Sequence, residues 1–453
     1  MKTNNDQFVI EGLAGAKTLK GRIGVGGAKN AILKVLASSI LFRDGFTVSN
    51  VPAIEDVSQI LALLQELGGQ VKKLKTHRYE LKSDSFHNFI LASELSKQLR
   101  ASVVLTGSLL ARFGEVQFPH PGGCVIGKRP IDLFLDGFQK MGATVTETGE
   151  NFLVKAQGGK LKGAEIFFKN QSVTATETLM MAGVLAEGQT VLKNCALEPE
   201  IVSLGEFLNK CGARISGLGT PTIEIEGGEL LSGQNQVYET VPDRIEAGSF
   251  IILGALAGSD LTVENCRSDH LDSLINLLRE TGVEIEIGDN WVRVKNDQAS
   301  SAKATAGQRK FTAIDVKTHE YPGFPTDLQA PLAIFLTQAE GQSFIFETIF
   351  EGRLNYLEAL NRMGAKTKII DPQRALIDGP TPLTGHEIES PDLRAGLAYV
   401  LAAIIASGQS VVHNVKYIDR GYEQIEKRLQ AIGVKIERLA GDQNNQCPSL
   451  PQN

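Results

Sequence analysis

The sequence contains little cysteine: five residues in 453, at positions 124, 195, 211, 266 and 447. So few do not form the disulfide framework typical of small secreted domains, and they predict a reducing, cytoplasmic environment. Long apolar runs are missing too. The longest, such as 397–406, are too short to cross a bilayer, and the polar residues 1–7 lack the apolar segment of a signal peptide. The net charge of -6 excludes a bulk attraction to nucleic acid or anionic membranes.

Common cofactor and catalytic motifs are also absent. The glycine-rich residues 24–27 are not followed by Gly-Lys-Ser/Thr, so they do not form a P-loop, and the Gly-x-Gly-x-x-Gly pattern is not met. There is no Gly-x-Ser-x-Gly nucleophile motif. The seven histidines are scattered without the spacing of zinc ligands. We therefore expect no metal and no cofactor, and nothing implies an obligate protein partner.

What the sequence does contain is a sixfold repeat. Each unit has an apolar helical stretch, a Gly, a short β-rich run, a second helical stretch and a second Gly. The two glycines are separated by 23, 28, 24, 24, 23 and 25 residues in successive units. The first helices are expected at 31–42, 101–113, 176–186, 245–257, 328–339 and 393–406. An Asn follows the β-rich run in four units, where it suits a turn, and the second Gly suits a helix C-cap.

Six similar units predict an α/β fold of two domains with three units each. We expect the first domain to span 29–241 and the second to comprise 1–28 and 242–440. Strand-like segments at 8–10 and 21–25 can pair back with the second domain. Residues 441–453 are rich in Gln, Asn and Pro, lack periodicity, and are expected to form a disordered tail.

Charged residues mark the beginnings of the apolar helices. Asp243 and Asp392 are ordinary helix caps at least as readily as they are ligands. Lys29, Arg100 and Arg394 oppose the helix dipole. Either their side chains extend to the surface, or an anionic group lies nearby.

Cys124 stands apart from the other cysteines. Cys195, Cys211 and Cys266 occupy repeat positions that are apolar in other units, so we expect them in the core. Cys124 lies in a Gly-rich loop that makes the second unit longer, close to Lys128 and Arg129. Neighbouring cations favour a thiolate, so the sequence predicts a reactive thiol in a loop.

Six segments resemble the UDP-N-acetylglucosamine 1-carboxyvinyltransferase family of enolpyruvyl transferases, in collinear order over residues 8–438. They are Gly-Gly-Ala-Lys-Asn-Ala at 26–31, Arg-Ala-Ser at 100–102, Pro-Gly-Gly-Cys-x-Ile-Gly-x-Arg-Pro-x-Asp-Leu at 121–133, Phe-Pro-Thr-Asp-x-Gln-Ala at 324–330, Asp-Leu-Arg-Ala at 392–395 and Ile-Asp-Arg-Gly-Tyr-Glu at 418–423. These motifs are long and specific.

The resemblance implies a two-domain inside-out α/β barrel, which agrees with the repeat count. It also implies transfer of enolpyruvyl from phosphoenolpyruvate to the 3-hydroxyl of UDP-N-acetylglucosamine by addition and elimination, with release of phosphate. This reaction begins bacterial peptidoglycan precursor synthesis and is the target of fosfomycin-type epoxides.

The resemblance also implies roles for individual residues. Cys124 matches the proton donor and Asp327 the proposed base, while Lys29, Arg129 and Arg420 match the cations that hold phosphate. The residues that match the rest of the substrate site are Asn30 and Thr326 at the sugar, Pro130, Ile131, Asp132 and Leu133 at the uridine, Ser172 and Val173 at the nucleotide backbone contacts, Ile349, and the charged cleft residues Arg100, Arg353, Asp392 and Arg394.

The chain departs from the family at two positions. Lys34 stands in the first helix where the family usually has Pro, which we expect to affect packing more than chemistry. Thr174 replaces a Gly beside the nucleotide-contact residues. Two alternative functions stay open: the sister enzyme 5-enolpyruvylshikimate-3-phosphate synthase, and a catalytically silent paralogue that binds a UDP-sugar as a regulator.

Overall fold

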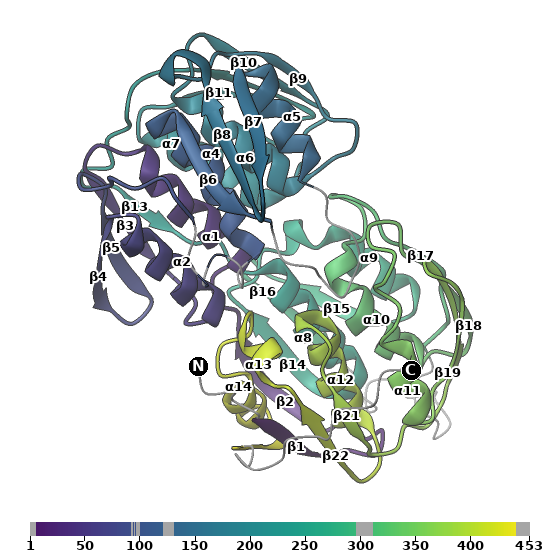
Figure 1. The fold of residues 1–453 in the computed structure, drawn as a ribbon. Helices are drawn as coiled ribbons and strands as arrows, with labels where there is room; N and C mark the ends of the chain where they lie inside the picture. Colours follow the sequence, from purple (N-terminus) through teal and green to yellow (C-terminus); the bar gives the residue numbers. More distant parts are fainter. Residues whose placement is uncertain are drawn as a thin grey trace.

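The computed structural model describes residues 6–91, 94, 96, 100–120, 131–295 and 311–440, without the side chain of residue 100. Within these ranges, six small sheets surround buried helices, and the whole divides into two lobes (Figure 1). The sixfold repeat and the inside-out α/β fold expected from the sequence are therefore confirmed.

One apolar helix from each unit forms the interior. These helices are α1 (Lys29–Ser38), α4 (Leu105–Phe113), α6 (Val173–Val184), α8 (Arg244–Ala257), α10 (Gln329–Leu336) and α12 (Leu393–Ile405). Short 3-10 turns extend three of them: η1 (Ser39–Leu41), η2 (Arg100–Val104) and η5 (Thr326–Leu328). In α8 every residue is buried, as expected for a helix that is apolar on all faces.

The first lobe carries three sheets, with strand orders β13-β3-β5-β4, β6-β8-β7 and β11-β12-β10-β9. Their strands are β3 (Gly45–Ser49), β4 (Gln70–Lys75), β5 (Arg78–Lys82), β6 (Glu115–Pro119), β7 (Ala143–Thr148), β8 (Asn151–Ala156), β9 (Glu165–Phe167), β10 (Gln189–Lys193), β11 (Arg214–Ser216), β12 (Thr222–Glu226) and β13 (Val237–Glu239).

The second lobe carries three more, ordered β15-β16-β14-β2, β17-β18-β20-β19 and β21-β22-β1-β23. Their strands are β1 (Gln7–Glu11), β2 (Leu19–Gly24), β14 (Gly258–Glu264), β15 (Glu284–Ile287), β16 (Trp291–Lys295), β17 (Val316–Lys317), β18 (Gly341–Phe346), β19 (Lys366–Asp371), β20 (Arg374–Gly379), β21 (Glu387–Glu389), β22 (Gln409–His413) and β23 (Lys435–Leu439).

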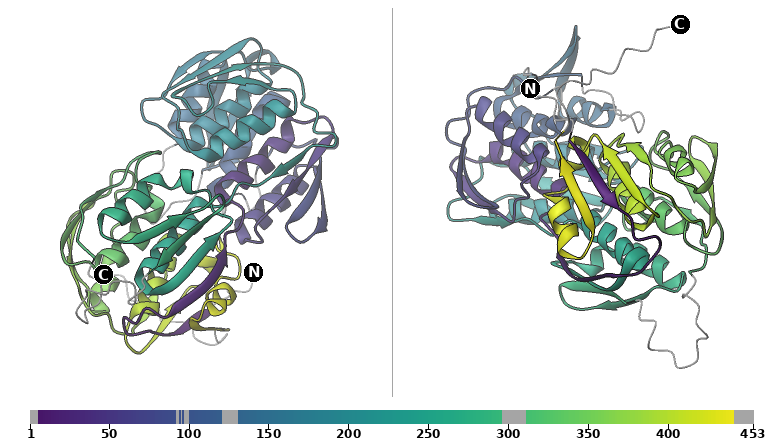
Figure 2. Two further views of the ribbon diagram at one scale, coloured as in Figure 1. Left: turned by 180° about the vertical axis from the view of Figure 1, so that it is seen from behind. Right: turned by 90° about the horizontal axis from the view of Figure 1, so that it is seen from below.

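The N-terminal strands belong to this second lobe, as the sequence predicted. β2 runs parallel to β14, and β1 lies antiparallel between β22 and β23. In the other second-lobe sheets this central place is taken by β16 and β20, each of which follows its neighbour by a tight turn. In the last unit, as described up to residue 440, this place is taken by β1, which Figure 2 shows beside the C-terminal strands.

A second helix follows the first in each unit. These helices are α2 (Glu55–Glu66), α5 (Asp132–Lys140), α7 (Pro199–Lys210), α9 (Asp272–Glu280), α11 (Leu357–Arg362) and α14 (Ile425–Ala431); the remaining short helical segments are η3 (Gln157–Gly159), η4 (Ser268–His270) and α13 (Lys416–Asp419).

The repeated turn residues behave as expected. The second glycine of every unit has a left-handed backbone, with φ between 83° and 106°. The four repeated asparagines, Asn50, Asn194, Asn265 and Asn414, also have positive φ, between 53° and 61°. Asn tolerates this conformation better than other residues with a side chain, which explains why it recurs at these turns.

Each lobe has its own hydrophobic core. The first runs from Ile32 to Tyr238, and the second combines residues from Phe8 to Val25 with others from Ile245 to Ile436. The chain crosses between the lobes twice, and the two crossings lie side by side: Ala28 N donates to Val241 O at 2.7 Å, and Asp243 N donates to Gly26 O at 2.9 Å. In the described part of the chain, no helix is both long and apolar enough to cross a membrane.

Candidate active site

Lys29, the first residue of α1, lies in a cluster of opposite charges. Its backbone N–H donates to Asp243 Oδ2 at 3.1 Å, and its ammonium lies 2.6 Å from Asp56 Oδ2. The anionic group that the sequence predicted beside this cation is therefore a carboxylate of the protein. Burial lowers the pKa of Lys29, Arg394 and Arg420 lower it further, and Asp56 opposes them.

Asp56 also pairs with a cation from the other lobe. Arg420, directly after α13, donates from Nε to Asp56 Oδ1 at 2.9 Å. One first-lobe carboxylate thus joins Lys29 to a second-lobe arginine. Burial opposes ionisation of Asp56, but the two cations outweigh it and hold the pKa of the carboxyl below its ordinary value.

Asp56 is a residue that sequence reasoning missed. It lies in the first turn of α2 and is 1% exposed, on the same face as the buried Ile60 and Leu63. A carboxylate on the apolar face of an amphipathic helix is the signal that could have found it. A short helix, α13, separates Arg420 from the preceding strand β22.

A second cluster surrounds Asp327, in η5 at the start of the α10 unit. Its Oδ1 pairs with Arg353 Nη2 at 2.8 Å, and its Oδ2 pairs with Arg394 Nη2 at 2.9 Å. Two buried guanidinium groups therefore orient the carboxylate. Arg394 also acts electrostatically on Lys29, so this cluster adjoins the first.

Thr326 is held by the same network. It donates to Glu347 Oε2 and accepts from Arg353 Nη1, each at 2.9 Å. Glu347 is fully buried, and its Oε1 accepts from the backbone N–H groups of Ile349 and Phe350 at 2.9 and 3.1 Å. Glu347 thus fixes the backbone at Ile349, one of the residues matched to the substrate site.

The capping interpretation is confirmed for both helix-start aspartates. Asp392 Oδ1 accepts from Arg394 N at 2.7 Å and from Ala395 N at 3.1 Å. Asp243 Oδ1 accepts from the N–H groups of residues 245 and 246 in the same way at α8. These bonds satisfy N–H groups that a helix start otherwise leaves without partners.

On the nucleotide side, Ser172 caps α6, accepting from Ala175 N at 3.2 Å. Val173 begins the helix, and Thr174 follows inside it without a positive φ. The backbone at position 174 therefore does not require the glycine found in the family. Ile131 and Leu133 lie against the first-lobe core at the start of α5, while Asp132 is exposed.

Three sequence-predicted residues, Cys124, Arg129 and Pro130, lie outside the described residues, as does the side chain of Arg100. The described candidates divide into two groups. Lys29, Arg420, Thr326, Asp327, Arg353, Asp392 and Arg394 belong to the adjoining charge clusters. Asn30, Ser172, Val173 and Ile131–Leu133 lie at three first-lobe helix starts, with Asn30 directly after Lys29, and Ile349 is held by Glu347 beside the second cluster.

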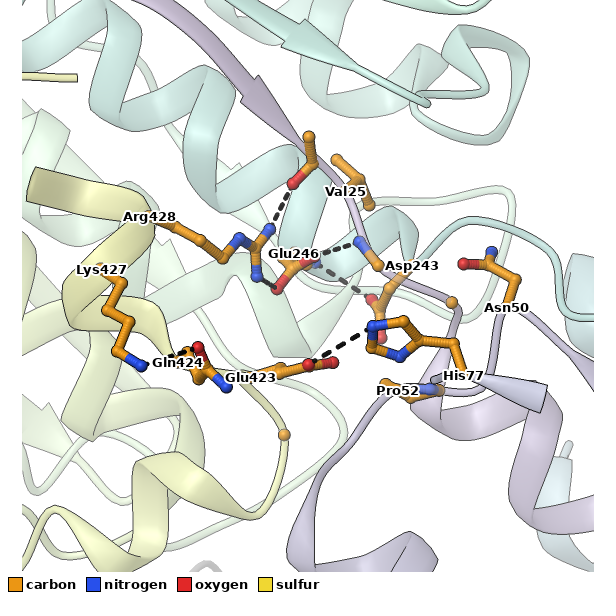
Figure 3. A pocket seen from close by; sticks show the side chains of 14 residues that line it. Val25, Asn50, Pro52, His77, Asp243, Glu246, Glu423, Gln424, Lys427 and Arg428 are labelled. Atoms are coloured by element: carbon orange, nitrogen blue, oxygen red, sulfur yellow. Dashed lines mark hydrogen bonds and ion pairs between the residues drawn. The ribbon is translucent and has the colours of Figure 1, made fainter. Parts of the chain in front are cut away.

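A cavity of about 370 Å³ lies beside these clusters, between the lobes (Figure 3). None of the residues matched to the substrate site lines it, although Asp243 of the Lys29 cluster does. Its charges are largely paired internally: Arg428 with Glu246, and Glu423 with His77 and the N–H of Ala53. The lining residues are Gly24, Val25, Gly26, Gly27, Asn50, Pro52, His77, Asp243, Glu246, Gly421, Glu423, Gln424, Lys427 and Arg428.

The buried cysteines also match expectation. Cys195, Cys211 and Cys266 are free thiols in the cores. Burial raises the pKa of each thiol to about 12, so none of them is a competent nucleophile near neutral pH.

Comparison with known proteins covers nearly the whole chain. Residues 13–429 match the profile of the family described as EPSP synthase (3-phosphoshikimate 1-carboxyvinyltransferase). The chain is 43% identical over 437 residues to the UDP-N-acetylglucosamine 1-carboxyvinyltransferase of Koribacter versatilis, covering 96% of each protein. It is 42% identical to the enzyme of the same name from Desulforapulum autotrophicum, covering 94% of this chain and 99% of that one.

Solved structures show the same fold at lower identity. The enolpyruvyl transferase NikO from Streptomyces tendae superposes with a TM-score of 0.84 at 22% identity, covering 97% of this chain and 100% of that one. EPSP synthase from Acinetobacter baumannii superposes with a TM-score of 0.68 at 20% identity, covering 96% and 100%.

Proposed function

The chain belongs to the enolpyruvyl transferase family, and on that premise we propose that it transfers enolpyruvyl from phosphoenolpyruvate to the 3-hydroxyl of UDP-N-acetylglucosamine, releasing inorganic phosphate. Identity above 40% over nearly the full length, to relatives that carry this activity in their names, supports this acceptor over shikimate 3-phosphate.

One structural observation carries the proposal: cations from both lobes converge on one small, buried locus. Lys29 and Arg420 meet at Asp56, and Arg394 lies close enough to act on Lys29. Lys29 and Arg420 share the one carboxylate of Asp56, so these two cations together carry one positive charge more than Asp56 neutralises. Such an arrangement favours a multiply charged anion, and a phosphoryl group fits this chemistry.

In the proposed reaction, the sugar hydroxyl adds to the substituted carbon of the enol while the methylene carbon gains a proton. The carbon–oxygen bond to phosphate then breaks, and a proton leaves the methyl carbon to restore the double bond. Asp327 is the proposed acceptor of the hydroxyl proton, and Cys124 the proposed donor to carbon. Lys29, Arg129 and Arg420 are proposed to hold phosphate as it departs.

The arginines around Asp327 support its assigned role. A base that must face one hydroxyl needs a fixed orientation, and Arg353 provides it from the turn before α11 while Arg394 provides it from the start of α12. Thr326 is proposed to face the sugar beside it. Arg100, Pro130, Ile131, Asp132, Leu133, Ser172, Val173 and Ile349 complete the proposed nucleotide-sugar site.

We also propose that residues 29–241 form one domain and residues 1–28 with 242–440 the other, and that the substrates bind between them. The membership of the two hydrophobic cores supports this division. The proposed compartment is the cytoplasm, which suits the free thiols among the described residues. There the reaction would begin peptidoglycan precursor synthesis.

The test is acceptor-dependent phosphate release. The full-length protein is incubated with phosphoenolpyruvate in three reactions: with UDP-N-acetylglucosamine, with shikimate 3-phosphate, and without an acceptor. We expect phosphate release only in the reaction that contains UDP-N-acetylglucosamine. Phosphate release only in the reaction that contains shikimate 3-phosphate would identify the sister enzyme. Binding of the nucleotide sugar with no release under any condition would identify a silent paralogue.

A further inference from the structure

A buried ion pair joins two of the first-lobe core helices. Lys34 in α1 is 7% exposed, Glu177 in α6 is fully buried, and Lys34 Nζ lies 3.1 Å from Glu177 Oε2. The sequence predicts that Lys34 affects packing more than chemistry. The structure shows that its side chain carries its charge into the interior and pairs with Glu177 there.

The pair reaches the beginnings of both helices. The Lys34 ammonium also donates to the backbone carbonyl of Asn30 at 2.7 Å, one turn earlier in α1. Glu177 lies in the second turn of α6, just beyond the Ser172 cap and Val173. The ion pair therefore connects the turn that presents Asn30 with the turn that follows the proposed nucleotide contacts.

Stability alone does not account for this pair. Burying two charges costs solvation energy, and replacing a buried ion pair with apolar residues is often neutral or stabilising. Among the described residues, no donor satisfies hydrogen-bond geometry at either Glu177 oxygen. Glu198 and Glu200 act on the same carboxyl with like charge. A costly pair that links two parts of one binding site is better explained by what it positions.

We infer that Lys34 and Glu177 are positioning residues for the acceptor: they set the Asn30 turn of α1 against the Ser172 and Val173 end of α6, and so set the spacing between the sugar and nucleotide contacts. This inference rests on the proposed function. Neither side chain touches substrate in this account; both act through the two helix starts.

The test compares three variants of the full-length enzyme. Lys34→Met removes the ammonium and keeps the chain length. Lys34→Met/Glu177→Met replaces both charges with apolar groups. Unlike the single variant, it does not leave the buried Glu177 carboxylate without its cation. Lys193→Met is the matched control, since Lys193 forms an exposed ion pair with Glu165 in the same lobe, at 2.7 Å. Circular dichroism checks folding, and phosphate release gives kcat and KM for each substrate separately.

We expect both Lys34 variants to raise KM for UDP-N-acetylglucosamine about tenfold, within the range for residues coupled in one network, with kcat and the phosphoenolpyruvate KM nearly unchanged. Lys193→Met should match the wild type. The inference is overturned if the double variant has the wild-type KM for UDP-N-acetylglucosamine. In that case each charge serves only to compensate the other, and the pair does not position the two helix starts. The inference is also overturned if the Lys34 variants behave like Lys193→Met, or if both substrates are affected equally. If Lys34→Met does not fold, the double variant decides. A wild type that releases no phosphate with this acceptor would refute the proposed function instead.

Discussion

Arg420 offers the sharpest test of the phosphate site, because it brings a second-lobe cation to Asp56, whereas Asp56 and Lys29 lie in the first lobe. Its guanidinium bonds Asp56 across the lobes, while Asp56 keeps Lys29 at 2.6 Å as a second partner. Substituting Arg420→Ala therefore removes one cation without leaving a buried carboxylate unpaired. Folding should survive, since the Arg420 side chain is 35% exposed.

The size of the effect follows from the bond that is lost. A charge-assisted hydrogen bond contributes about 1.5–3 kcal/mol, so losing one made to the departing phosphate should lower turnover by about tenfold to 150-fold. Binding of UDP-N-acetylglucosamine should change little, because the sugar contacts are assigned to other residues. Asn30→Ala, in contrast, should weaken binding of the nucleotide sugar itself.

Calorimetry with UDP-N-acetylglucosamine and steady-state phosphate release separate the two cases. Arg374→Ala serves as a control, because Arg374 on β20 forms an exposed ion pair with Asp371 on β19 and neither residue is assigned to the site. Equal loss of nucleotide-sugar affinity in Arg420→Ala and Asn30→Ala, with folding intact in both, would show that Arg420 has been assigned wrongly.

Three further predictions follow from other parts of the chain. Cys124→Ala should lower turnover by about 10² or more, while Cys124→Asp should retain activity and resist fosfomycin-type epoxides; mass spectrometry that finds alkylation at a buried cysteine would contradict this assignment. Burial raises the pKa of Glu177 from 4.5 to about 7, so as pH rises the carboxyl ionises in the unfolded chain before it ionises in the folded protein. The free energy of unfolding of the wild type should therefore fall by about 3 kcal/mol relative to that of Glu177→Gln between pH 4.5 and 7. Urea unfolding that gives the same difference in stability between the two proteins at every pH would disprove this prediction. Gly107→Ala should destabilise the first lobe by about 1–3 kcal/mol because its Cβ would lie 2.1 Å from Thr178 O, whereas Gly228→Ala, with nothing nearer than 4.0 Å, should leave the melting temperature unchanged.

The fold was largely predictable from local patterns. Apolar helices, strand-like runs and turn residues recur at similar spacing, and each reflects short-range physics. Asn50 and its three equivalents show this, because a left-handed turn selects Asn wherever the unit repeats. The strand-like pattern of residues 8–10 indicated a strand able to pair back with the second domain, and β1 does pair with β22 and β23.

The site was predictable only in part. Lys29 could be identified as a cation in an unfavourable position at a helix start, and the sequence indicated that an anion should lie near it. It could not indicate that Asp56 is that anion, or that Arg420, 364 residues further along, shares it. Such a contact depends on how the two lobes pack against each other, and the local periodicity of the sequence does not predict that packing.

Lys34 shows the same limit inside one lobe. From sequence it is a lysine in an apolar helix, with an expected effect on packing and no indication of its partner. The tertiary structure turns it inward, because α6 brings Glu177 within 3.1 Å and makes burial of the charge tolerable. The sequence by itself determined the repeated units, the helix caps and the core cysteines, since these depend on neighbours along the chain. Which charges meet was decided by the packing of helices that lie far apart in sequence, because a buried charge is stable only where the fold supplies its partner.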